Sequence, residues 1–124
     1  MGKRQALGKW GENLAAEYLS SHGYSIKYRN FRTPYGEIDL IAELQQGDLK
    51  TIIFVEVKTR TTRTYGPPED AVNTRKRSHL LSAAQHYMQN QPDESNWRID
   101  VIAIEKYPAN ESPELFHFEN AFSE

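Results

Sequence analysis

Residues 37–59 carry the sequence EIDLIAELQQGDLKTIIFVEVKT, which predicts two strands joined by a tight turn. Both halves, 37–44 and 51–59, contain the β-branched and other apolar residues that are typical of strands. Between them, Gly47-Asp48 is a glycine-first pair of the kind that occupies two-residue hairpin turns. We therefore expect an antiparallel hairpin over this stretch.

The position of the turn predicts which residues face each other in this hairpin. It pairs Ile41 with Phe54 and, toward the open end, Asp39 with Glu56 and Glu37 with Lys58. All six side chains should lie on one side of the sheet, because side chains alternate along a strand. A bulge or a slip by one residue would break this register.

The rest of the chain predicts further helices and strands around the hairpin. Apolar residues recur at helical spacing near the N-terminus and again in the second half, and Gly23 ends the first helix. In the strand before the hairpin, Tyr24, Ile26 and Tyr28 should share one face. The last long strand should run parallel to the third, because a helix connects the two. The expected elements are a helix over 6–22, strands over 24–32, 37–44 and 51–59, a loop over 60–70, a helix over 71–89, and strands over 97–104 and 115–118. The order α-β-β-β-α-β-β predicts an α/β sandwich around a mixed sheet.

Composition limits the classes of protein that this chain can belong to. With 124 residues and 38% hydrophobic residues, residues 1–124 should form a single domain. Cysteine is absent, which excludes disulfides, thiolate metal sites and a cysteine nucleophile. The sequence shows no signal-peptide pattern and no apolar run of membrane-spanning length, so we expect a cytoplasmic protein.

Charge is distributed unevenly along the chain. Residues 1–80 contain 13 of the 15 Lys and Arg residues but 9 of the 17 acids, whereas residues 81–124 contain 2 basic residues and 8 acids. The first part is therefore the candidate for binding an anion such as nucleic acid.

The open end of the hairpin holds the most suggestive group of polar residues. Asp39 and Glu56 should face each other, and a shared proton, the ammonium of Lys58 or a divalent metal would each offset their repulsion. A metal with Lys58 beside it would favour phosphodiester hydrolysis, since the metal activates water and the lysine orients or deprotonates it. Alternatively, Glu37, Asp39, Glu56 and Lys58 form an ion-pair ladder on a solvent-facing end of the sheet.

The residues of this hairpin also resemble a known family. The segments GEIDLIA at 36–42 and FVEVKTR at 54–60 are similar to those of the YraN-like family of small bacterial proteins, in the PD-(D/E)xK nuclease superfamily. The resemblance implies a restriction-endonuclease-like fold, related to archaeal Holliday-junction resolvases and to the catalytic domains of tRNA-splicing and transposon endonucleases. Further matches cover nearly the whole chain: Gly11-Glu12, Ala15 to Leu19, Gly23-Tyr24, Asn30 to Arg32, Lys76, Ala83-Ala84, Arg98 to Val101 and Asn120 to Phe122.

The resemblance also implies roles for individual residues. It places the metal-binding acid on Asp39, the second acid on Glu56 and the lysine on Lys58, with the backbone carbonyl of Val57 as a further metal ligand. The proline of the superfamily's name is absent, since Ile38 precedes Asp39.

Resolvase-like members add a glutamate from the first helix. Glu12 is the match, because it shares a helical stripe with Ala16 and Leu19 and can approach the sheet. Glu17 is the competing position on the same helix.

A candidate nucleic-acid surface follows the third strand. The basic residues could contact a phosphate backbone that passes the acids, and Tyr65 could stack on an unpaired base. Lys76 lies on the apolar stripe of its helix, so it is the basic residue expected to point toward the acids. The residues concerned are Arg60, Arg63, Tyr65, Arg75 and Lys76.

Together these observations predict a Mg²⁺- or Mn²⁺-dependent endonuclease that acts on structured or branched DNA. The alternatives are a nucleic-acid-binding accessory protein of the same fold that cleaves nothing, and a protein-interaction module whose charged ladder is structural. Resolvase relatives act as dimers, so a homodimer is a further expectation.

Overall fold

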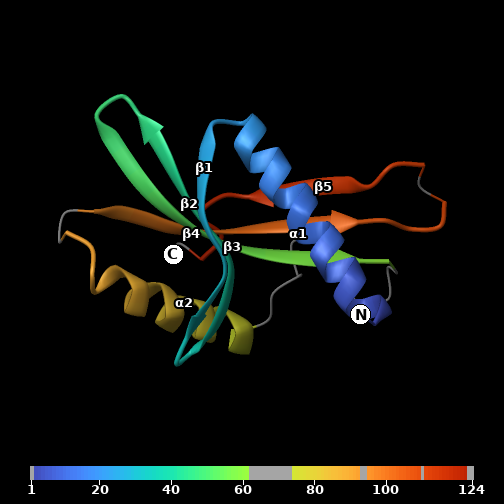
Figure 1. The fold of residues 1–124 in the computed structure, drawn as a ribbon, viewed down its shortest axis with the longest axis horizontal. Helices are drawn as coiled ribbons and strands as arrows, with labels where there is room; N and C mark the ends of the chain where they lie inside the picture. The colour runs from blue at the N-terminus through green and yellow to red at the C-terminus, as the bar shows by residue number, and fades with distance from the viewer. Residues whose placement is uncertain (1, 62–73, 93–94, 110, 123–124) are drawn as a thin grey trace.

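The computed structural model describes residues 2–61, 74–92, 95–109 and 111–122, and these form one five-stranded sheet with two helices (Figure 1). The predicted order of elements, α-β-β-β-α-β-β, is confirmed, with boundaries that differ by a few residues. The elements are α1 (Lys3–Ser21), β1 (Tyr24–Thr33), β2 (Gly36–Gln46), β3 (Leu49–Arg60), α2 (Thr74–Met88), β4 (Asn96–Glu105) and β5 (Glu114–Phe118).

The strands lie in the order β1-β2-β3-β4-β5. The β3 and β4 strands are parallel, as the helical connection predicted, and every other neighbouring pair is antiparallel. The sheet is therefore mixed, with β3 at its centre.

No helix in the described part of the chain is both long and apolar enough to cross a membrane.

The β2–β3 hairpin has the predicted register. Ile41 pairs with Phe54, and the ladder continues to Gln46 and Leu49 beside the Gly47 turn. Gly47 has a φ of 61°, a left-handed conformation that glycine adopts without steric cost.

The ladder ends at Leu40 and Val55, so the prediction that Asp39 pairs with Glu56 and Glu37 with Lys58 is wrong for these described residues. Instead of continuing the ladder, the Asp39 side chain accepts a hydrogen bond from the backbone N–H of Val57. The two strands part at this point.

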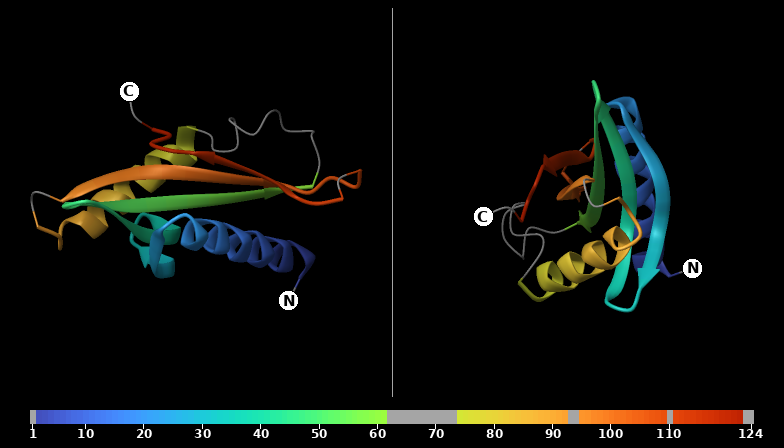
Figure 2. Two further views of the ribbon diagram at one scale, coloured as in Figure 1. Left: turned by 90° about the horizontal axis from the view of Figure 1, so that it is seen from above. Right: turned by 90° about the vertical axis from the view of Figure 1, so that its left-hand side faces the viewer.

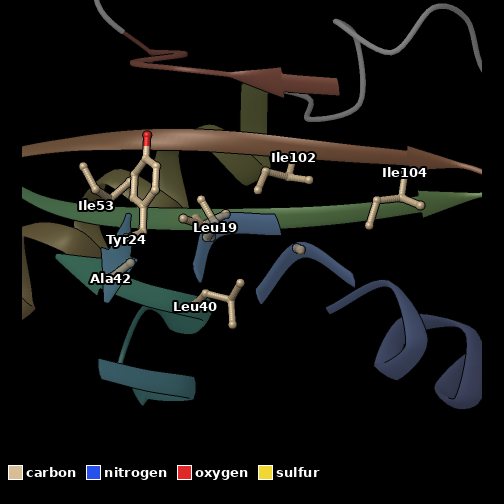
Figure 3. Packing of buried hydrophobic residues seen from close by; sticks show 9 residues of the cluster. Leu19, Tyr24, Leu40, Ala42, Ile53, Ile102 and Ile104 are labelled. Carbon is tan, nitrogen blue, oxygen red and sulfur yellow. The ribbon is translucent and has the colours of Figure 1, made fainter. Parts of the chain in front are cut away.

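Two apolar cores lie on opposite faces of the sheet. The first packs α1 against the odd-numbered residues of β3 and the even-numbered residues of β4 (Figure 3). The second packs α2 against Ile52, Phe54 and their neighbours on the other face. The right-hand view of Figure 2 shows α1 on one side of the sheet and α2 on the other. The chain is therefore a three-layer α/β arrangement, and its central strand is buried on both sides.

The first strand is irregular in a way that the sequence pattern does not predict. A bulge lies between Ile26 and Tyr28, so Ile26 packs in the α1 core whereas Tyr28 contacts Phe31 and Tyr87 on the α2 side. The expectation that Ile26 and Tyr28 share a face is therefore wrong, because an extra residue reverses the alternation.

A polar network ties β5 and the turn after it to the sheet. Asp100 is fully buried and lies 2.9 Å from Arg98 Nε and 2.7 Å from His117 Nε2. Asp100 also accepts a hydrogen bond from the backbone N–H of Asn120. The network therefore combines a neighbour within β4, Arg98, with His117 of β5 and the turn at Asn120.

Candidate functional site

Three carboxylates from three different elements gather near the point where β2 and β3 part. Glu12 comes from α1, Asp39 from β2 and Glu56 from β3. The helix can bring Glu12 close because Gly11 precedes it: a Cβ atom at Gly11 would lie 1.9 Å from Thr59 Oγ1. The backbone of α1 thus lies directly on β3, and only glycine permits that distance.

Asp39 is the most constrained member of this group. Its Oδ2 accepts a hydrogen bond of 2.8 Å from the Val57 N–H, so the side chain takes the place of a ladder carbonyl. The N–H and C=O of one residue point toward the same edge of a strand. The Val57 carbonyl therefore faces the gap that β2 leaves.

Glu56 is almost completely buried, with 5% of its surface exposed. Its Oε1 lies 3.1 Å from the Lys76 Nζ of α2. Its Oε2 is buried and has no hydrogen-bond partner among the described residues. An ionised oxygen without a partner is costly in a protein interior, so the geometry leaves a position that a cation would satisfy.

Glu12 shares with Glu56 a buried side-chain oxygen that lacks a partner among the described residues. In Glu12 this oxygen is Oε1. Burial and the negative charge of Asp39 raise the pKa of the Glu12 carboxyl, whereas the Asn30 side chain and the charge of Arg29 lower it. Glu12 and Asp39 are therefore close enough to repel each other.

The pKa of Asp39 shows how strongly the carboxylates interact. Burial and the negative charge of Glu56 raise this pKa from the ordinary 3.8 to about 7, although the Val57 N–H and the charge of Lys76 lower it. With a pKa of about 7, the Asp39 carboxyl therefore holds a proton in a large fraction of molecules at neutral pH. A nearby divalent cation would reverse that preference, because it favours the ionised form.

The donor set fits a hard divalent cation better than a transition metal. It consists of carboxylate oxygens and one backbone carbonyl, the donors that Mg²⁺ and Mn²⁺ prefer. Within the described residues, no three His, Cys, Asp or Glu side chains form a ready-made metal cage. A Mg²⁺ site does not need one, because this ion binds one or two carboxylates and keeps several waters.

Lys58 lies in β3 two residues beyond Glu56, and its side chain is exposed. No ion pair joins it to Glu37 within the described residues, and Glu37 instead lies 3.7 Å from Arg32 of β1. Glu56 pairs with Lys76. The ion pairs thus do not form the predicted ladder across β2 and β3, and Lys58 stays open to solvent beside the acids.

The residues predicted to contact nucleic acid have different environments. Arg60 is buried and paired with Glu105 of β4, so it serves the packing of the sheet. Arg75 is exposed at the start of α2, and Lys76 reaches the acids. Arg63 and Tyr65 lie outside the described residues.

Asn30 is a site residue that the sequence reasoning did not single out. It lies in β1 with a φ of 54°, a left-handed conformation that asparagine tolerates better than most residues. Its side chain lies near Glu12 and acts to lower the pKa of that carboxyl. The available signal was the asparagine itself, an unusual residue inside a strand.

These features define the class of protein: a small mixed α/β protein with three neighbouring acids, of which Glu56 is almost completely buried, where strands β2 and β3 part. The chain belongs to the family described as "Uncharacterised protein family UPF0102", whose model matches residues 11–104. It is 44% identical to the UPF0102 protein of Geobacter metallireducens over 119 residues, which span 95% of this chain and 93% of that protein. It is 41% identical to the UPF0102 protein of Syntrophotalea carbinolica over 121 residues, 97% of this chain and 94% of that protein. The expectation that the chain belongs to a family of small bacterial proteins is therefore confirmed, and that family is UPF0102.

Among solved structures, the chain is similar to SfsA of Pyrococcus furiosus in complex with Ca²⁺. The match has a TM-score of 0.40 and 18% identity, and it covers 94% of this chain and 63% of the other.

Proposed function

We propose that this protein is a Mg²⁺- or Mn²⁺-dependent endonuclease that acts on structured or branched DNA. One observation carries the proposal: two buried carboxylate oxygens, Glu12 Oε1 and Glu56 Oε2, have no hydrogen-bond partner among the described residues, and both side chains interact electrostatically with Asp39. A group that only stabilised the fold would gain by pairing these oxygens. The resemblance of residues 36–42 and 54–60 to PD-(D/E)xK nucleases supports the same reading.

In this mechanism each residue has a defined task. Asp39, Glu56 and the Val57 carbonyl would hold the ion, and Glu12 would hold it directly or through a water. When bound, the ion supplies an activated water and stabilises negative charge on the phosphate. The Val57 N–H fixes the orientation of Asp39. Lys58 is exposed next to the acids, where its ammonium can orient the water or contact the phosphate.

The choice of DNA as substrate is supported by charge. The excess of basic residues lies in residues 1–80, which contain all three acids of the site and Lys58. A phosphate backbone near the acids would need such cations. The preference for branched structures comes from the resemblance to resolvases.

Cleavage assays with labelled DNA test the proposal. Duplex, single-stranded, flap and four-way-junction DNA are incubated with Mn²⁺, Mg²⁺ or EDTA and with wild type, Asp39→Ala or Lys58→Ala. We expect wild type alone to cut, and only with metal. The decisive comparison is between variants prepared identically, because equal cutting by all three would indicate contamination and exclude this site.

The accessory-protein alternative predicts a different result in the same assay. Binding would persist without cleavage, and Asp39→Ala would keep or increase the affinity, because removing an acid near the phosphate reduces repulsion. A protein-interaction module predicts no affinity for nucleic acid at all.

A further inference from the structure

Lys76 is placed where a helix does not favour a cation. It is the third residue of α2, and none of the residues in the first turn is acidic. The N-terminal end of a helix carries partial positive charge, so a lysine there is destabilising unless an anion offsets it. Glu56, on a strand beneath the helix, lies 3.1 Å away and offsets this charge.

The two members of this ion pair differ greatly in exposure. The Glu56 side chain is 6% exposed and fixed in the sheet, whereas the Lys76 side chain is 50% exposed. The lysine therefore reaches in from solvent on a flexible four-carbon chain. Its ammonium can leave Glu56 without any opening of the apolar core.

The ammonium also lies beside the position that the proposed metal would take. It lies on Glu56 Oε1, and its positive charge acts on Asp39 as well. A divalent ion held by Asp39 and Glu56 would lie within a few ångströms of this ammonium, and the two positive charges would repel each other.

We infer that Lys76 is the resident counter-ion of the metal site: its ammonium neutralises Glu56 until a divalent ion displaces it. Lys76 is thus a positioning residue that sets the metal affinity of the site. The inference rests on the proposed function, since it assumes a metal at Asp39 and Glu56.

Metal affinity without nucleic acid tests this inference. Mn²⁺ is titrated calorimetrically into the full chain as wild type, Lys76→Met, Lys76→Arg and Lys50→Met. Because the repulsion is lost, we expect Lys76→Met to bind Mn²⁺ at least about tenfold more tightly than wild type. Lys76→Arg, which keeps the charge, should stay within about threefold of wild type.

Lys50→Met is the matched control. Lys50 has the same side-chain exposure of 50% and also pairs with a glutamate, Glu43, away from the site. The Lys50→Met variant should leave the Mn²⁺ affinity unchanged.

Thermal unfolding gives a second readout. Without metal, Lys76→Met should melt below wild type, and Mn²⁺ should raise the melting temperature of this variant more than that of wild type.

The outcomes separate this inference from the proposed function. If wild type binds Mn²⁺ through Asp39 and Lys76→Met binds it equally or more weakly, Lys76 does not compete with the metal and the inference is wrong. If neither wild type nor Lys76→Met binds Mn²⁺, the metal site itself is excluded and the proposed function fails with it.

Discussion

Asp39 completes the hydrogen bonding of the sheet and also forms part of an acidic cluster. Its carboxylate receives the Val57 N–H that a ladder carbonyl would otherwise receive. Burial and, after it, the charge of nearby Glu56 raise the pKa of this carboxyl to about 7. The site is therefore built at a cost to stability, as is common where charged groups serve function.

The raised pKa of Asp39 predicts a specific dependence of stability on pH. Because the folded pKa of about 7 exceeds the ordinary 3.8, the native state binds more protons between these values, and stability falls as pH rises through this window. Asp39→Asn removes the ionisable group and therefore this loss of stability at high pH. We expect the variant to exceed wild type at pH 8 by on the order of 2 kcal/mol and by much less at pH 5.

Urea unfolding at pH 5, 6, 7 and 8 without metal measures this difference. The asparagine can still accept the Val57 N–H, so the variant isolates the effect of charge. A difference between the two proteins that does not change with pH would contradict the prediction.

The sequence predicted some site residues better than others, for physical reasons. Asp39 and Glu56 could be brought together because turn position and strand alternation are local rules. The pairing of Arg60 with Glu105 could not be predicted, because it depends on the register of two parallel strands joined by a long connection. Lys76 was expected to point toward the acids, but its partner depends on how α2 crosses the sheet.

At the scale of elements, the contact between α1 and β3 determines the position of Glu12. The helix backbone at Gly11 leaves no room for a Cβ atom beside Thr59. Gly8, one turn earlier in the same helix, has nothing within 4 Å of a Cβ placed there. The two glycines therefore offer a matched pair of substitutions.

Gly11→Ala should destabilise the protein by about 1–3 kcal/mol, because the new methyl group overpacks a rigid contact. Gly8→Ala should instead stabilise it by roughly 0.5–1 kcal/mol through helix propensity. Chemical unfolding of both variants measures the difference.

A double variant tests whether contact with Thr59 causes the destabilisation expected in Gly11→Ala. In Gly11→Ala with Thr59→Ala, the Oγ1 atom that lies 1.9 Å away is gone, and the nearest remaining atom is a Cβ at 3.2 Å. Most of the lost stability should return. No recovery would mean that the overpacking arises elsewhere.

The attachment of β5 to the sheet depends on charge rather than on steric packing, so it predicts an effect of pH on stability. Although burial raises it, hydrogen bonds with His117, Arg98 and Asn120 hold the pKa of Asp100 below its ordinary value. Its contribution to stability is therefore present at neutral pH and lost as pH falls below about 4. Asp100→Ala should cost about 3–5 kcal/mol, because it leaves Arg98 without its buried partner.

Hydrogen exchange can locate this loss in the sheet. Amides of β5 and of the turn at 119–122 should lose protection first in Asp100→Ala. Uniform loss across β1 to β5 would show that the network stabilises the whole sheet rather than one edge.

At the scale of the whole molecule, the architecture followed from the alternation of helical and strand patterns. The mixed sheet, the parallel pair and the hairpin register are all confirmed. The bulge in β1 was not predictable from alternation, because one extra residue changes the face of every residue beyond it. Near the site, the pairing of β2 with β3 differs from the predicted one because the Asp39 side chain, and not a backbone carbonyl of β2, accepts the hydrogen bond of the Val57 N–H.

Metal binding should be visible as stability of the whole chain. An ion that binds only the folded state stabilises it by about 2.7 kcal/mol at a concentration one hundred times its dissociation constant. We expect Mn²⁺ to raise the melting temperature of wild type and EDTA to reverse the increase. Asp39→Ala should show no shift, and an equal shift in both proteins would place the metal elsewhere.

The position of the site between two separate cores has a consequence for how each helix affects metal binding. Glu12 is held by the helix of one core and Lys76 by the helix of the other, while Asp39 and Glu56 lie in the sheet between them. A partly folded chain with either helix undocked would lack one wall of the acidic cluster. Undocking of α1 would remove Glu12 from the proposed site, whereas undocking of α2 would remove the competing ammonium and the cover over Glu56, so the two layers would affect metal binding in different ways.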